Sequence, residues 1–181
     1  MSGYNNVKIG ACHGVYHPRE DSELLADAVE KYAYGRVLDM GTGSGIQGII
    51  AARKGCDVTF SDIDPLALRC AEANSAANGV KGKFIESDLF SGIHGSFDTI
   101  IFNPPYLPSD SFTETALDGG RDGRHYIKRF IDSYNGFVNP RHVVLLLESS
   151  LNNYPADVDL LNSEIVSRRV FPFEELVVLK F

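Results

Sequence analysis

The residues with the clearest chemical meaning form the tetrapeptide Asn103-Pro104-Pro105-Tyr106, which directly follows the apolar stretch at residues 98–102. A planar NH2 group has two hydrogens, and the Asn103 side-chain oxygen and the Pro104 carbonyl can accept both. Consecutive prolines stiffen the backbone and remove N–H donors that would compete for these acceptors. Tyr106 adds a flat face for stacking an amide or a base. The motif suits methyl transfer to an amide or exocyclic amino nitrogen, although Asn-Pro and Pro-Pro also occur in plain rigid turns.

A glycine-rich turn lies earlier in the chain, after the buried stretch Arg36–Met40. Glycines allow a sharp turn and a close approach of the backbone to a ligand, just before a helix begins. One interpretation is a nicotinamide enzyme, because Gly43, Gly45 and Gly48 match the dinucleotide pattern GxGxxG. A second is an S-adenosylmethionine site, and a third is a turn that binds no ligand. The residues of this turn expected to bind a cofactor are Asp39, Gly41, Thr42, Gly43 and Gly45.

Three aspartates help to choose between these interpretations. Asp39 precedes the glycines, where a carboxylate would repel a pyrophosphate but attract the amino group of a methionine moiety. Asp62 follows the next strand and can hold ribose hydroxyls in either kind of enzyme. Asp88 can accept a hydrogen bond from an adenine amino group, although taken alone, without the tetrapeptide motif, it fits a solvated loop aspartate better. The nucleoside is therefore expected beside Asp62 and Asp88, with their neighbours Ile63 and Leu89.

Apolar periodicity predicts the elements that position these residues. Helices are expected over residues 20–33, 46–54, 64–77, 125–137 and 157–162. Strands are expected over residues 36–40, 57–60, 83–85, 97–102, 142–147, 165–171 and 176–181. Alternating strands and helices indicate a parallel sheet covered on both faces. The predicted fold class is α/β: a doubly wound, Rossmann-like sheet of the class I methyltransferase type, mostly parallel with a C-terminal antiparallel hairpin.

Length and composition narrow the class of protein. The 181 residues suit one domain, with residues 1–18 as an N-terminal extension or lid. The net charge of −7 argues against a protein that grips duplex DNA or long RNA. Cys12, Cys56 and Cys70 are odd in number and form no CxxC pair, so neither disulfides nor a metal site are expected, and a reducing, cytoplasmic location is favoured. No stretch approaches the ~20 apolar residues of a membrane helix.

Together these motifs resemble those of the HemK/PrmC-type N5-glutamine methyltransferases of peptide-chain release factors. Residues 15–21 are similar to the V-Y-x-P-x-E-D opening of the short archaeal and eukaryotic branch, and residues 119–124 to its G-G-R-x-G-R segment. The resemblance covers the chain from Val15 to the C-terminal strand. It implies an enzyme that uses S-adenosylmethionine to methylate the glutamine in the GGQ loop of a class I release factor.

The resemblance also assigns roles to single residues. Asn103, Pro104, Pro105 and Tyr106 would hold the glutamine amide, and Asn103 would also contact the cofactor. The opening segment closes over the cofactor in relatives, and His17 departs from them where an acidic residue is frequent. The residues of this chain that match the closing segment are Tyr16, Glu20, Asp21 and Ser22.

Two protein partners are implied. The release factor would dock on Arg121 and Arg124, which otherwise belong to a plain surface loop before a helix. The short branch also works with a small zinc-binding activator subunit that pairs with an edge strand. Here Lys83-Phe84-Ile85 would be that edge, and an uncovered apolar edge is a liability for a lone chain.

Two alternatives stay open. The first is an N6-adenine or N2-guanine methyltransferase acting on nucleic acid, since such amino groups fit the same acceptors. The negative charge and the lack of room for a base-flipping recognition domain argue against it. The second is a non-catalytic scaffold that binds the cofactor and stabilises a partner. A scaffold has no need of the acceptors at Asn103 and Pro104, which argues against this alternative too.

Overall fold

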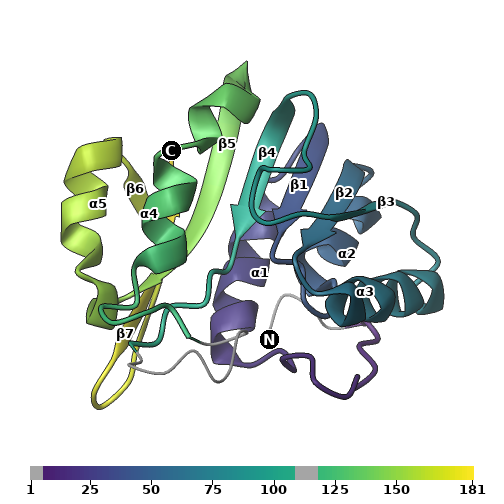
Figure 1. The fold of residues 1–181 in the computed structure, drawn as a ribbon, viewed down its shortest axis with the longest axis horizontal. Coiled ribbons are helices and arrows are strands. Elements are labelled where there is room, and N and C mark those ends of the chain that lie inside the picture. The colour runs from purple at the N-terminus through teal and green to yellow at the C-terminus, as the bar shows by residue number, and fades with distance from the viewer. Residues whose placement is uncertain (1–5, 109–117) are drawn as a thin grey trace.

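The computed structural model describes residues 6–108 and 118–181, which build one mixed sheet with the strand order β3-β2-β1-β4-β5-β7-β6 (Figure 1). The first five strands are parallel, whereas β7 runs antiparallel to both β5 and β6. This confirms the predicted α/β sheet with its antiparallel C-terminal hairpin. The strands are β1 (Arg36–Met40), β2 (Asp57–Asp62), β3 (Lys83–Glu86), β4 (Phe97–Phe102), β5 (Val138–Ser149), β6 (Glu164–Val170) and β7 (Glu175–Lys180).

Helices cover both faces of the sheet, and each face has its own apolar cluster. Alternate residues of β1 point to opposite faces: Val37 joins the cluster with α1 and α2, whereas Leu38 joins the cluster with α4. In Figure 1, α1 passes behind the sheet and α4 lies in front of it. The helices are α1 (Glu20–Tyr32), α2 (Ile46–Arg53), α3 (Pro65–Ala77), α4 (His125–Ile131) and α5 (Tyr154–Leu161), with short 3-10 turns η1 (Tyr134–Phe137) and η2 (Ser150–Asn152).

The starts of α2 and α3 have local causes. The Asp64 carboxylate accepts the Leu66 N–H at 2.8 Å and caps α3, and Pro65 occupies the first turn, where no N–H is needed. Before α2, Gly45 has a φ of +85°, and a Cβ there would lie 3.0 Å from the Ala71 backbone. Glycine therefore allows the turn and lets α2 begin close against α3.

The predicted elements differ from the structure mainly after residue 124. The helix expected over residues 125–137 ends at Ile131 and is followed by η1. Tyr134 nevertheless packs on Phe130, with ring centroids 6.0 Å apart, so the apolar spacing continues past the end of the helix. Strand β5 begins at Val138 and reaches its main register with β4 after an irregularity, which makes it longer than expected. Helix α5 begins before the predicted residue 157, after Asn153 in the left-handed conformation.

One expectation about the cysteines is wrong. Cys12 and Cys70 form a disulfide that joins the N-terminal segment to α3, and Cys56 is a free thiol. The backbone N–H of Gly10 also bonds Asn74 Oδ1 at 2.9 Å, so the segment is held to the same helix twice. Sequence spacing does not reveal this pair, because its members are 58 positions apart and meet only in the folded chain.

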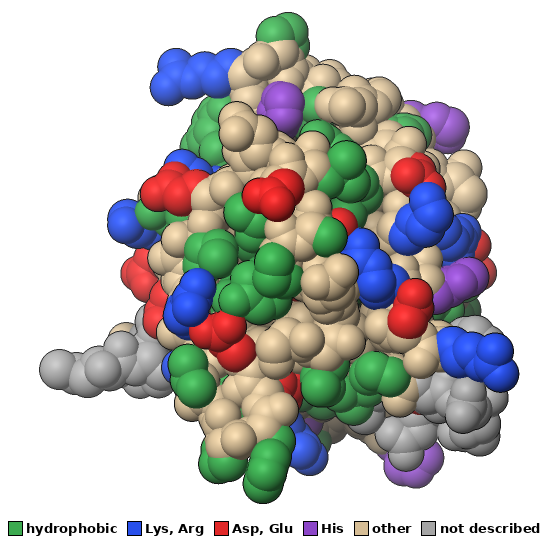
Figure 2. Space-filling view, turned by 90° about the vertical axis from the view of Figure 1, so that its left-hand side faces the viewer, with side chains coloured by type: hydrophobic (Ala, Val, Ile, Leu, Met, Phe, Trp, Pro, Cys, Tyr) green, Lys and Arg blue, Asp and Glu red, His purple; other side chains and the backbone are tan. Residues whose placement is uncertain are grey.

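The sheet has two edges, β3 and β6. Figure 2 views the molecule from the side of α5 and β6, where the exposed apolar side chains include Leu160 and Val170. Charged side chains of both signs interrupt the apolar surface on this side. Across the described residues, no helix combines the length and apolar character that crossing a bilayer requires.

Candidate active site

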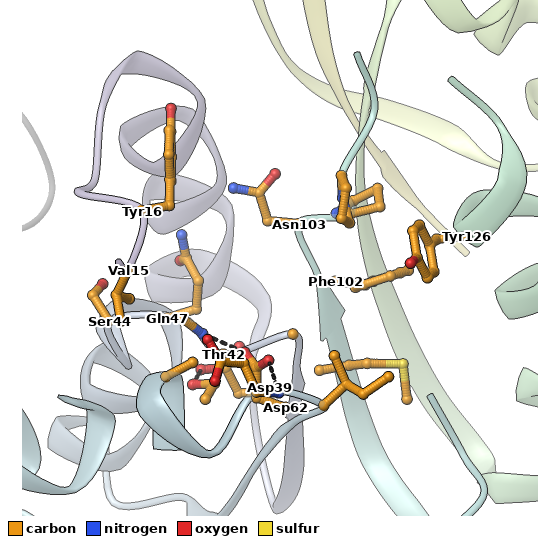
Figure 3. Close-up of a pocket in the computed structure, with 18 of the residues that line it drawn as sticks. Val15, Tyr16, Asp39, Thr42, Ser44, Gln47, Asp62, Phe102, Asn103 and Tyr126 are labelled. Atoms are coloured by element: carbon orange, nitrogen blue, oxygen red, sulfur yellow. Dashed lines mark hydrogen bonds between the residues drawn. The ribbon is translucent and has the colours of Figure 1, made fainter. Parts of the chain in front are cut away.

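A cavity of about 550 Å³ opens at the carboxyl ends of β1, β2 and β4, where open α/β sheets bind their ligands (Figure 3). The N-terminal segment before α1 forms part of its wall. The structure therefore brings most of the predicted site residues to one place. Those that line the cavity are Tyr16, Ser22, Asp39, Gly41, Thr42, Gly43, Asp62, Ile63, Asp88, Leu89, Asn103, Pro104, Pro105 and Tyr106.

Asp39 lies at the centre of the glycine turn. Its Oδ2 accepts hydrogen bonds from Thr42 Oγ1 at 2.6 Å and from the Gly48 N–H at 2.9 Å. Burial raises the pKa of this carboxyl to about 7, because a charge there is poorly solvated, even though both hydrogen bonds favour the charged form. Asp39 therefore shapes the turn, and a cationic ligand beside it would stabilise the charged form of its buried carboxylate.

Asp62 holds the other side of the turn. Its Oδ2 accepts the Gly43 N–H at 2.9 Å, and its Oδ1 accepts the Asp64 N–H at 3.0 Å. Burial is again the main cause that raises the pKa of the Asp62 carboxyl. Each carboxylate oxygen has a second lone pair, so Asp62 can still accept hydrogen bonds from a ligand's hydroxyls.

The charge of the lining selects among ligands. Among the described residues, no Lys, Arg or His lines the cavity, whereas five aspartates do. Such a wall favours a ligand with positive charge and repels a pyrophosphate. The nicotinamide interpretation is disfavoured on this ground. The five aspartates are Asp21, Asp39, Asp62, Asp64 and Asp88.

The Asn103 side chain is fixed by Asp21 at the start of α1. Asn103 Nδ2 donates to Asp21 Oδ2 at 3.0 Å, and the other Asp21 oxygen accepts the Tyr16 hydroxyl at 3.1 Å. A carboxylate accepts hydrogen bonds and donates none, so the nitrogen of the amide must face Asp21. Asn103 Oδ1 is then left buried, with no hydrogen-bond partner among the described residues. Figure 3 shows this side chain extending from β4 toward Tyr16 and Gln47.

The far end of the tetrapeptide is also anchored. The Tyr106 carbonyl accepts a hydrogen bond from Asn152 Nδ2 at 2.7 Å. Gly123 packs so closely that a Cβ at this position would lie 2.2 Å from the same carbonyl. Leu107 accepts the Gly119 N–H at 2.9 Å. Part of the glycine-rich segment before α4 therefore serves to hold the Asn103–Tyr106 loop in place.

Arg124 has a role inside the fold that its surface-loop position did not suggest. Its guanidinium makes two hydrogen bonds to Asp157, at 2.7 and 2.8 Å, and also donates to the Asn152 carbonyl. Asp157 is buried, and the buried Glu148 Oε2 lies 3.9 Å from Arg124 Nη1. Arg124 thus links α5 to the loop anchor at Asn152, whereas Arg121 is exposed.

Comparisons with known proteins agree with this geometry. The family described as "Methyltransferase small domain" matches residues 7–118. A candidate protein N5-glutamine methyltransferase of Methanocaldococcus jannaschii is 40% identical over 96% of this chain and 94% of its own. The chain belongs to this methyltransferase family. The release factor glutamine methyltransferase of Deinococcus radiodurans is 34% identical over 76% of the chain, which matches 55% of that longer protein.

The methyltransferase also resembles a solved structure over nearly its whole length. The E. cuniculi Mtq2-Trm112 complex, described as responsible for methylation of the eRF1 translation termination factor, matches with a TM-score of 0.74. Identity is 28%, and the match covers 92% of this chain and 97% of that one. The resemblance to release-factor glutamine methyltransferases that the motifs indicated is thereby confirmed.

Three residues that were predicted to bind the cofactor have contacts in the structure that differ from the prediction. Glu20 and Gly45 do not belong to the cavity lining. The Glu20 carbonyl instead accepts a hydrogen bond from Arg169 at 3.3 Å. Asp88 lines the cavity, but its Oδ2 also forms an ion pair with Arg129 at 2.8 Å. That pair is about 40% exposed on both sides, so it is weak and can adjust when a ligand approaches.

Sequence reasoning missed several lining residues, of which Gln47 and Tyr126 are the most informative. Gln47 sits in the first turn of α2, directly after the glycine turn, and this position was the only signal available. Tyr126 comes from α4 and reaches the cavity from the opposite face of the sheet. No local pattern predicts that contact.

Glu148 gives the methyltransferase a distinctive dependence of stability on pH. Burial, reinforced by the neighbouring Asp157, raises the pKa of Glu148 from 4.5 to about 9, and Arg124 only partly opposes this. The folded state then holds a proton that the unfolded state releases between these values. The free energy of unfolding should fall as pH rises through this window.

Replacing Glu148 with Gln is expected to remove this part of the pH dependence. Urea unfolding at pH 5, 7 and 9 should show a flatter profile for E148Q, which gains stability relative to the wild type as pH rises. Asp39, whose raised pKa also contributes, is present in both proteins and cancels in the comparison. Parallel profiles for the two proteins would contradict a protonated Glu148.

Proposed function

We propose that this methyltransferase uses S-adenosylmethionine to methylate the side-chain amide of the glutamine in the GGQ loop of a class I release factor. The observation that carries the proposal is the buried, unpartnered Asn103 Oδ1, the acceptor end of an amide whose nitrogen binds Asp21, on a residue that lines the cavity. An amide NH2 group is the kind of donor this acceptor lacks. The names of the similar Deinococcus and E. cuniculi proteins support the same substrate.

The residues present fit the proposed cofactor. The anionic lining suits a ligand with a sulfonium and an ammonium group, and none of the described lining residues opposes these charges. Asp62 is available for the ribose hydroxyls, and Asp88 for the adenine amino group. Tyr16, Ser22 and the glycine turn would enclose the amino-acid portion. When bound, S-adenosylmethionine supplies an electrophilic methyl group.

The catalytic work of the chain is to position the substrate amide. Asn103 Oδ1 and the Pro104 carbonyl would accept its two N–H bonds, and Tyr106 would stack on its flat face. An amide nitrogen is a weak nucleophile, so alignment and exclusion of water must do most of the work, with alignment alone worth up to ~7–11 kcal/mol. The acceptors also stabilise positive charge as it develops on the nitrogen. The proton can leave after the transfer, so no strong base is required.

The proposal is tested with labelled S-adenosylmethionine and a class I release factor. Label should enter the wild-type factor and should be absent from a factor whose GGQ glutamine is replaced by alanine. Equal labelling of both factors would refute the glutamine assignment. A parallel reaction with duplex DNA and total RNA covers the nucleic-acid alternative, which label in those substrates would favour.

A small partner subunit is also part of the proposal, as suggested by the two-protein complex of the E. cuniculi relative. We place it on β3, which among the described strands pairs with β2 alone and is the edge strand nearest the proposed nucleoside end. Ile63 and Leu66, after β2, are 54% and 48% exposed and add apolar surface on this side. We propose that the subunit binds zinc and that both proteins act in the cytoplasm, with Arg121 docking the release factor.

Co-expression tests the partner. A small zinc-binding subunit from the same genome is expected to co-purify, to raise the yield of monodisperse protein and to strengthen cofactor binding. The methyltransferase purified alone should aggregate or bind cofactor weakly. Full activity and monodispersity without any partner would contradict the need for one, while leaving the glutamine assignment intact.

A further inference from the structure

Gln47 carries a second buried acceptor, which has no role in the proposed binding of the substrate amide. It lies in the first turn of α2 and is 4% exposed. Its Nε2 donates to the Ser22 carbonyl at 2.9 Å. A carbonyl only accepts, so this contact decides which end of the amide is the oxygen. Gln47 Oε1 is therefore held in place, buried and without a hydrogen-bond partner among the described residues.

Gln47 and Asn103 differ from the other described residues that have a buried, unpartnered polar atom, because these two line the cavity. Among the described residues, five residues besides Asn103 have such side-chain atoms, and of these only Gln47 lines the cavity. A buried polar atom without a partner costs about 1–3 kcal/mol, so one that belongs to a residue lining a cavity marks a place where a ligand can complete the hydrogen bond. The missing partner of Gln47 must be a donor.

The order of the strands shows which part of the ligand Gln47 would meet. The sheet runs β3-β2-β1-β4, with Asp88 after β3, Asp62 after β2, the glycine turn after β1 and Asn103 after β4. On the proposed function, the nucleoside lies over β3 and β2, and the acceptor amide lies at β4. Gln47 follows the turn after β1 and contacts α1 through Ser22. It therefore belongs to the amino-acid end of the cofactor.

We infer that Gln47 Oε1 accepts a hydrogen bond from the α-ammonium group of the cofactor's amino-acid portion. That portion ends in an ammonium and a carboxylate, and only the ammonium is a donor. A carboxylate at the same place would set oxygen against oxygen. The buried Asp39 in the same wall adds an attraction for the cation. Gln47 is thus a positioning residue that makes binding depend on the amino group, and this inference rests on the proposed function.

The experiment measures binding, so it does not depend on turnover. The full chain, in its complex if a partner co-purifies, is titrated calorimetrically with S-adenosylhomocysteine and with 5′-methylthioadenosine, which lacks the amino-acid portion. Gln47→Met keeps the length of the side chain and removes the acceptor together with the Nε2 donor to the Ser22 carbonyl, so the comparison of the two nucleosides isolates the part that depends on the amino-acid portion. We expect Q47M to weaken S-adenosylhomocysteine binding about 10- to 100-fold, as for a hydrogen bond to a charged group. Binding of 5′-methylthioadenosine should change less than about twofold.

A deaminated analogue of S-adenosylhomocysteine allows a double cycle, in which the amino group is removed from the ligand and the acceptor is removed from the protein, separately and together. The wild type should bind this analogue about as weakly as Q47M binds S-adenosylhomocysteine, and Q47M should lose nothing further with it. The inference is overturned if Q47M weakens both nucleosides equally, or if the wild type does not discriminate against the analogue. A wild-type complex with its partner subunit that binds neither S-adenosylhomocysteine nor 5′-methylthioadenosine would instead refute the proposed function.

Discussion

Replacing Asn103 with alanine is expected to lower the rate of methyl transfer at least about a hundredfold, while cofactor affinity changes less than about twofold. Removing one preorganised hydrogen-bonding group around a reacting centre has effects of about 10²–10³ in kcat. The side chain can be removed without disturbing the glycine turn, because its contact is to Asp21 at the start of α1. The loss should appear in the rate constant of methyl transfer measured in single-turnover assays and leave the Kd of S-adenosylhomocysteine nearly constant.

The matched control for Asn103→Ala is Asn135→Ala, which removes an asparagine side chain from the exposed η1 turn. This variant should keep wild-type activity. Activity of the Asn103 variant within about fivefold of the wild type would remove the proposed acceptor role. A parallel loss of cofactor binding would instead mean that the loop had collapsed, which the thermal unfolding midpoint would report independently.

Replacing Arg124 with methionine is expected to destabilise the fold by about 3–5 kcal/mol, because it leaves the buried Asp157 without its cation. Glu148, which lies close by, holds a proton at neutral pH and adds no charge of its own, so the cost comes from Asp157. The same change loosens Asn152, which holds the Tyr106 carbonyl. Urea unfolding measures the first effect. A kcat loss at temperatures where the variant is fully folded measures the second.

Lys128→Ala is the control for Arg124→Met, since it breaks an ion pair of similar length in the same region. Lys128 pairs with Asp132 at 2.9 Å, but the two side chains are 72% and 60% exposed. An exposed pair of this kind contributes about 0.3–0.5 kcal/mol, so K128A should unfold almost like the wild type. Equal destabilisation by the two variants would contradict the argument that burial makes the Arg124 pair important.

Sequence by itself determined the order of the elements, the position of the site and the class of chemistry. Each of these depends on short-range physics. Periodicity sets which face of a helix or strand is buried, glycines permit the turn before α2, and two prolines stiffen the loop after β4. The carboxyl ends of parallel strands share one side of the sheet, so motifs that follow successive strands must meet there. Local patterns therefore sufficed to expect Asp39, Asp62 and Asn103 around one cavity.

Only the tertiary structure decided which atoms are free to bind. Asn103 meets Asp21 across 82 positions of the chain, and that contact alone leaves Oδ1 as the available end of its amide. Gln47 is oriented by Ser22 in the same manner. The sequence placed Arg124 in a surface loop, whereas in the fold it pairs with the buried Asp157. Folding also brings Cys12 and Cys70 together in a disulfide. Hydrogen-bond direction and burial belong to pairs of groups brought together by the fold, and no spacing within one segment encodes them.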